Sequence, residues 1–127
     1  LEVCQQHGDV ELTCAPVDLV PGTVEQQLPA LLGEHRGIDG LFAASDVIAM
    51  IAIAVLERSG TRIPEDVAVI GYDNVPMATF GARSLTTIDQ HLAASAEMLV
   101  QLLQLKLRGE EAASRISPPD LIIRGSA

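Results

Sequence analysis

Residues 63–74 read IPEDVAVIGYDN, and the fold class follows from this segment and its neighbours. Its middle, residues 67–72, is a run of apolar and β-branched side chains, which favours a strand. A polar turn with a proline precedes the run, and Asp73 and Asn74 follow it directly. Polar residues on both sides of a short apolar run predict a buried strand that ends at Tyr72.

Predicted helices and strands alternate along the rest of the chain. Before the central strand, an apolar strand at residues 41–44 leads through Ser45 into a helix at residues 46–59, which Gly60 ends. The other predicted elements are the end of a helix at residues 1–7, a strand at 10–15, a helix at 23–34, an extended piece at 86–88, a helix at 92–108 and a strand at 121–123. Strands joined through helices predict a parallel sheet with helices on both faces, which is an α/β sandwich.

The composition is that of one globular domain with no nucleic-acid or membrane contacts of its own. The chain has 127 residues, of which 48% are hydrophobic and 20% charged, and its formal net charge is −9. The few basic and aromatic residues do not suit binding of phosphate backbones or stacked bases. The longest apolar stretch, residues 47–56, is about half the roughly 20 residues that a membrane-spanning helix needs. Cys4 and Cys14 are too few for a disulfide scaffold and predict a reducing, cytoplasmic location.

The sequence contains no motif for catalysis or for a cofactor. It has no G-x-S-x-G, H-E-x-x-H, Walker or G-x-G-x-x-G pattern. A phosphoacceptor receiver domain would have this length and acidity, but it needs a lysine on a late strand, and Lys106, the only lysine, lies in a predicted helix. Cys4 and His7 have a C-x-x-H spacing, but Cys14 cannot complete a metal site with them. We therefore expect no enzymatic activity, no catalytic residue, no cofactor and no metal.

The carboxyl ends of the predicted parallel strands are the expected place for a ligand. They carry Val17-Asp18-Leu19, Ser45-Asp46 and Tyr72-Asp73-Asn74, and no lysine or arginine. An ionised carboxylate such as Asp73 accepts hydrogen bonds from vicinal hydroxyls or from ring N–H groups. This edge therefore favours a sugar, a polyol or a nucleobase over a phosphorylated anion. The alternative is that Asp46 and Asp73 only cap helices or turns, and for Asp46 this is the preferred interpretation.

Four segments, in the same order along the chain, resemble the LacI/GalR family of bacterial transcription regulators. They are residues 40–46 (GLFAASD), 63–74 (IPEDVAVIGYDN), 85–90 (LTTIDQ) and 118–124 (PPDLIIR). The resemblance implies a two-lobed effector-sensing domain, like a periplasmic sugar-binding protein, joined to a helix-turn-helix domain. It also implies that residues 1–127 are mostly the C-terminal lobe, and that DNA is bound only through the helix-turn-helix domain, which this chain lacks.

The resemblance also assigns roles to the segments that link the two lobes. It implies that residues 86–91 and 115–119 are inter-lobe crossovers, and that the helix at 92–109 packs on the N-terminal lobe, which is missing here. The apolar stripe of this helix needs a cover, because burying each leucine is worth about 1.5–3 kcal/mol. For the chain by itself, the cover could be its own sheet, a neighbouring chain or the missing lobe, and we expect a neighbouring chain.

Carried over position by position, the resemblance assigns an effector site to four residues. Asp73 matches the position whose carboxylate holds the effector, Ser45 a position beside the effector that is often asparagine, and Gln90 a crossover residue near the pocket. Leu19 matches a position where some members place an aromatic ring that stacks on the ligand. An arginine that many members contribute would lie upstream of Leu1.

The helix at residues 46–59 also predicts a homodimer. Its middle is apolar on every side, so that one face can pack on the sheet while the other needs a second cover. The residues predicted to meet the partner subunit are Met50, Ile53 and Ala54 of this helix and Phe80 of the segment 75–80. Such a symmetric interface is in keeping with the family. The alternative is a helix buried within one subunit.

Two other functions remain open from the sequence. A solute-binding component of a sugar transporter shares the fold, although residues 63–74 are more typical of regulators. A truncated domain with only a self-association role is the third interpretation. A helix-turn-helix domain upstream of Leu1, in place of a signal peptide, would identify the regulator.

Overall fold

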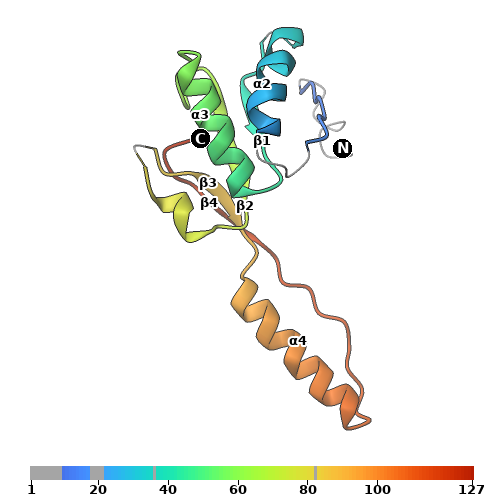
Figure 1. The fold of residues 1–127 in the computed structure, drawn as a ribbon. Helices are drawn as coiled ribbons and strands as arrows, with labels where there is room; N and C mark the ends of the chain where they lie inside the picture. Colours follow the sequence, from blue (N-terminus) through green and yellow to red (C-terminus); the bar gives the residue numbers. More distant parts are fainter. Residues whose placement is uncertain (1–9, 18–21, 36, 82) are drawn as a thin grey trace.

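The computed structural model describes residues 10–17, 22–35, 37–81 and 83–127. Its elements are α2 (Thr23–Glu34), β1 (Gly40–Phe42), α3 (Asp46–Arg58), β2 (Ala68–Tyr72), the 3-10 helix η1 (Pro76–Thr79), β3 (Thr86–Asp89), α4 (Leu92–Leu107) and β4 (Asp120–Ile122) (Figure 1). The sequence predicts each of these except η1 to within two residues at either end. Within this part of the chain, no helix has the length and apolar character needed to cross a membrane.

The strands form one sheet in the order β1-β2-β3-β4. The prediction of a parallel sheet is confirmed for β1, β2 and β3, whereas β4 runs antiparallel to β3. Figure 1 shows the reason, because α4 leads away from the end of β3 and the chain returns alongside it to enter β4. A chain that leaves and re-enters a sheet at the same edge runs in opposite directions in the two strands.

The core lies between β2 and α3. Val69 of β2 is fully buried, as are Ala49 and Leu56 of α3, and α2 packs against α3. On the opposite face of β2, Ile70 and Tyr72 keep part of their surface exposed. The second layer of helices that the sequence predicts on that face is not seen in the described residues.

The strand predicted at residues 10–15 is wrong. Residues 10–17 form no strand, most of their side chains are exposed, and the described backbone hydrogen bonds outside the regular elements do not involve them. A β-strand is stable only when it pairs with a neighbouring strand. The alternating apolar residues of this segment favour an extended conformation but do not provide a partner strand. Val17 is the residue of this segment that packs against the core. The helix end predicted at residues 1–7 lies outside the described residues.

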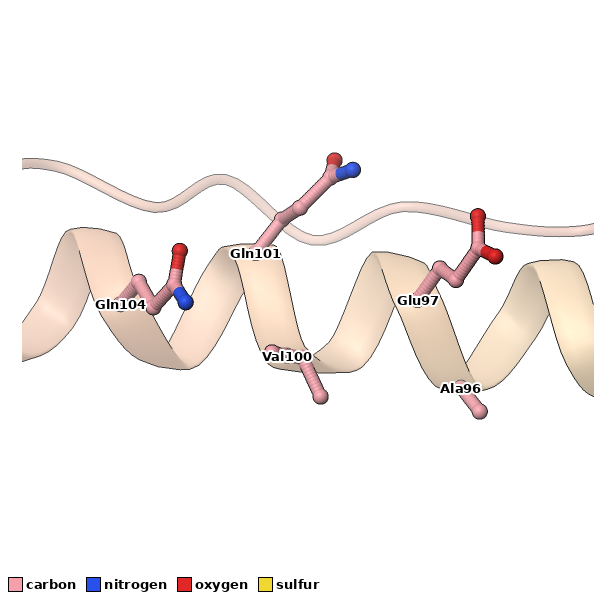
Figure 2. Close-up of a pocket in the computed structure, with 5 residues that line it drawn as sticks. All are labelled: Ala96, Glu97, Val100, Gln101 and Gln104. Carbon is pink, nitrogen blue, oxygen red and sulfur yellow. The ribbon is translucent and has the colours of Figure 1, made fainter.

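Helix α4 projects away from the sheet and buries none of its residues (Figure 1). Its leucines Leu99 and Leu103 are 68% and 58% exposed. The helix therefore does not fold back on β2 of its own chain, which agrees with the expectation that it reaches outward. Figure 2 shows Ala96 and Val100 pointing away from the chain segment beside the helix, whereas Gln101 points toward that segment. The apolar stripe of α4 remains open to a partner.

Candidate functional site

Three of the four predicted effector residues follow neighbouring strands of the sheet. Ser45 comes shortly after β1, Asp73 directly after β2 and Gln90 directly after β3. These three strands are parallel and paired in that order, so their carboxyl ends lie along one edge. This edge is where open α/β sheets bind ligands. Leu19, the fourth residue, lies outside the described part of the chain.

Asp73 and Gln90 are in direct contact. The Gln90 side-chain amide donates to Asp73 Oδ1 over 2.7 Å. No hydrogen bond among the described residues goes to Asp73 Oδ2, and the side chain is only partly buried. A partly exposed carboxylate with one oxygen held and the other open can accept hydrogen bonds from a small polar molecule. The Ser45 hydroxyl oxygen accepts from the Ile48 N–H over 3.3 Å and so caps α3.

The backbone at Asp73 adopts an unusual conformation. Its φ is 111° and that of Asn74 is 51°, values that residues other than glycine rarely adopt. Strand β3 holds this turn, because the Asp73 N–H donates to the Ile88 carbonyl over 3.0 Å and the Asn74 N–H to Thr87 Oγ1 over 3.4 Å. Backbone held in such regions by its surroundings is common at binding sites.

A hydrogen-bonded chain of polar side chains lies beside Asp73. Arg124 Nη2 donates to Asn74 Oδ1 over 2.7 Å, and Asn74 Nδ2 donates to Asp89 Oδ2 over 2.9 Å. The pKa of Asp89 is lowered, because the His91 N–H and the Asn74 amide both donate to its carboxylate. Arg124 also donates to the Leu85 carbonyl over 2.7 Å, so its guanidinium is already engaged within the protein.

The sequence did not predict these hydrogen bonds among Arg124, Asn74 and Asp89. Asn74 and Arg124 are 50 residues apart, and no motif spacing relates either of them to Asp89. The one signal was the position of Asn74 next to Asp73, at the end of a predicted strand. The partners became apparent only through the pairing of β2, β3 and β4.

Asp46 has a structural role, but not that of the helix or turn cap that the sequence interpretation preferred, since Ser45 is the N-cap of α3. Asp46 is the first residue of α3 and is fully buried. Its carboxylate accepts from the Val75 N–H over 2.8 Å and from the Thr87 hydroxyl. These contacts join α3 to β3 and to the loop after β2, so Asp46 acts as a tether between segments and not as a cap.

The four predicted dimer residues line one shallow hollow. Met50, Ile53 and Ala54 of α3 and Phe80 of the segment after β2 all line a cavity of about 250 Å³. Phe80 is 72% exposed, and Met77, three residues earlier in the sequence, is 65% exposed. The structure thus brings together apolar side chains from α3 and from the segment after β2, in a hollow that the Arg83–Glu57 ion pair also lines.

A protein-family model described as a periplasmic binding protein-like domain matches residues 5–127. The HTH-type transcriptional repressor PurR of Aliivibrio fischeri (strain ATCC 700601 / ES114) is 30% identical to the chain, over 94% of the chain and 38% of the repressor. The chain thus spans less than half the length of this curated relative.

Solved structures of regulators have the same fold. A LacI family transcriptional regulator from Arthrobacter sp. FB24, in complex with lactose, is 28% identical with a TM-score of 0.82, over 95% of this chain and 46% of that one. A complex of the transcriptional regulator CelR with cellobiose is 28% identical with a TM-score of 0.85, over 99% of this chain and 40% of that one. These proteins are regulators, and both structures contain a disaccharide.

Proposed function

Because the chain belongs to the periplasmic binding protein-like domain family, as the effector-sensing part of a LacI/GalR-type regulator, we propose that it helps to bind a neutral polyhydroxylated effector. In the intact regulator, this binding would be passed to a separate DNA-binding domain. Sugars and polyols have this polyhydroxylated chemistry, and a sugar is preferred. A nucleobase, which would donate ring N–H groups to the carboxylate in place of hydroxyl groups, is the alternative.

The observation that carries this proposal is the Asp73–Gln90 pair at the carboxyl edge of three parallel strands. Gln90 orients one oxygen of Asp73, and the other oxygen is available to a hydroxyl donor. Arg124, the cation nearest to this edge in the described network, is bound to Asn74 and to the Leu85 carbonyl. A site with a free carboxylate and an engaged guanidinium favours a neutral hydroxyl-rich ligand over a phosphorylated one.

The remaining site residues are part of the same proposal. Ser45 would add a hydroxyl donor from the start of α3, since its oxygen accepts from the Ile48 N–H while its proton goes to no acceptor among the described residues. Leu19 would contribute apolar contact where an aromatic ring would otherwise stack. The regulators that bind lactose and cellobiose favour a sugar, and the named relatives favour a regulator over a transporter component. A cytoplasmic location follows if the parent protein binds DNA.

We expect Asp73→Asn to weaken effector binding by the intact regulator by about 30-fold, because the neutral amide replaces a charged acceptor and offers one acceptor oxygen instead of two. Calorimetric titration with lactose, cellobiose, ribitol, adenine and a phosphorylated sugar measures the affinity. Asp66→Asn is the matched control, since Asp66 pairs with Arg62 on the exposed surface. Unchanged affinity in Asp73→Asn, or binding restricted to a phosphorylated sugar, would contradict the proposal.

The domain assignment is also proposed for the intact regulator. Residues 86–91 and 115–119 would cross between lobes, and α4 would pack on the N-terminal lobe. The support is that α4 leaves the sheet at one end of β3 and exposes its apolar stripe (Figure 1). For the chain without that lobe, the same stripe would be covered by a neighbouring chain.

We further propose that Met50, Ile53, Ala54 and Phe80 form a symmetric dimer surface. Phe80→Glu should weaken dimerisation of the chain by roughly 30-fold, because a charge would enter the centre of an apolar contact. Sedimentation velocity over a range of micromolar concentrations measures the dissociation constant. Phe42→Glu is the control, since the Phe42 side chain is also exposed but its ring packs edge-to-face on the Tyr72 ring of the sheet. A monomeric wild type, or equal weakening by both substitutions, would refute this surface.

A further inference from the structure

Residues 90–119 leave the sheet, form α4 and return to the sheet, and we call them the α4 excursion. An aspartate lies at each end of this segment. The chain leaves the sheet after Asp89, the last residue of β3, and re-enters it at Asp120, the first residue of β4 (Figure 1). The register of the antiparallel pair places these two residues directly opposite each other. Like charges at opposite positions of an antiparallel pair destabilise it. Repulsion between Asp89 and Asp120 therefore weakens the pairing of β3 and β4 at the end next to the α4 excursion.

Asp89 remains charged across the neutral and mildly acidic range. The His91 N–H donates to Asp89 Oδ1 over 2.7 Å, the Asn74 amide donates to Oδ2, and these two bonds lower the pKa of Asp89. Asp120 is on the surface, with 69% of its side chain exposed. Repulsion between the two carboxylates thus persists unless a cation lies between them.

The His91 ring occupies that position. Its Nε2 lies 2.9 Å from Asp120 Oδ2 and its Nδ1 lies 3.8 Å from Asp89 Oδ1. The left-handed backbone at His91, with φ of 53°, lets its N–H and its ring approach the same Asp89 carboxylate. Arg124 also acts on Asp89 through its charge. Arginine side chains in general do not change charge near neutral pH, so a pH-sensitive contact needs another group. Asp73, the next carboxylate on this edge, is bound by Gln90.

We propose that His91 is a pH-sensitive latch that holds the ends of β3 and β4 together at the base of the α4 excursion. Histidine changes charge between about pH 5 and 8. As an imidazolium it neutralises the Asp89–Asp120 pair, whereas as a neutral ring it retains a hydrogen bond and leaves the two carboxylates to repel each other. The latch is closed at low pH and loosens as the pH rises. This inference concerns the stability of the pairing between β3 and β4 and does not depend on which effector binds.

Amide hydrogen exchange of the 127-residue chain without ligand tests the latch. Protection factors, which correct each rate for the intrinsic effect of pH, are compared at about pH 5.5 and 8. We expect protection of the amides paired between β3 and β4 to fall by about threefold to fivefold toward pH 8, the size expected for partly exposed ion pairs. Amides paired between β1 and β2 are the internal control and should not change.

Two substitutions separate the latch from general effects of pH. His91→Gln removes the titrating ring, so the fall in protection should disappear, with protection low at both pH values. Asp120→Asn removes the repulsion without changing the histidine, so protection should stay high at both. An equal fall in His91→Gln, or no fall in the wild type, would overturn the proposal. If His91→Gln does not fold, a fall that persists in Asp120→Asn overturns it equally. Because no effector is present, failure of the proposed effector site would leave these results unaffected.

Discussion

Asp46→Ala is expected to lower the free energy of unfolding by about 3 kcal/mol, because it leaves the buried Thr87 hydroxyl and the part-buried Val75 N–H without an acceptor. The Asp46 carboxylate is fully buried and accepts from the Val75 N–H and the Thr87 hydroxyl. Water cannot replace an acceptor at a fully buried position without opening the contact between α3 and β3. The loop that follows Asp73 would lose its anchor at the same time.

Chemical denaturation of the 127-residue chain measures this effect. Asp66→Asn on the exposed Arg62 pair is the surface control and should change the free energy of unfolding far less than Asp46→Ala does. Thr87→Val combined with Asp46→Ala removes one donor together with its acceptor, so the double variant should be destabilised by less than the sum of the two single variants. A loss below about 1 kcal/mol in Asp46→Ala would show that the tether is not structural.

Gly71→Ala is expected to destabilise the chain by about 3 kcal/mol, at the upper end of overpacking effects. A Cβ at this position would overlap Asp46 Oδ1, lie 2.9 Å from Leu85 Cδ2 and lie 3.3 Å from Ala49 Cβ. All three neighbours are buried, so none can move aside into solvent. The added methyl group would therefore push α3 away from β2 and disturb the Asp46 tether.

Gly40→Ala is the matched control for this substitution. Gly40 is also a strand residue with an ordinary backbone conformation, but a Cβ there meets nothing within 4 Å. Thermal and chemical unfolding of both variants should show a large loss for Gly71→Ala and a change of less than about 0.5 kcal/mol for Gly40→Ala. Equal effects in the two variants would mean that β propensity and not the close packing of α3 governs Gly71.

The candidate site was partly predictable because it follows a rule about strand ends. Ser45, Asp73 and Gln90 come after apolar runs, and parallel strands place such residues on one edge. The Asn74–Asp89 contact and the opposition of Asp89 and Asp120 were not predictable, since they depend on the register between strands. A shift of two residues in that register would preserve the apolar pattern and remove both contacts.

Local pattern in the sequence determined most helices and strands, because periodicity, capping residues and turn residues act over a few neighbours. The local pattern does not show whether residues 10–15 pair with another strand, and it does not show whether β4 enters the sheet parallel or antiparallel to β3. Both depend on where a distant segment lies. Tertiary structure alone revealed that Asp46 is sealed in the core while Asp73 remains accessible, although both follow a strand in the sequence. The difference arises because Gly71 of β2, Thr87 of β3 and Val75 of the loop after β2 surround the Asp46 carboxylate. Burial is a property of the packed chain and not of the residue.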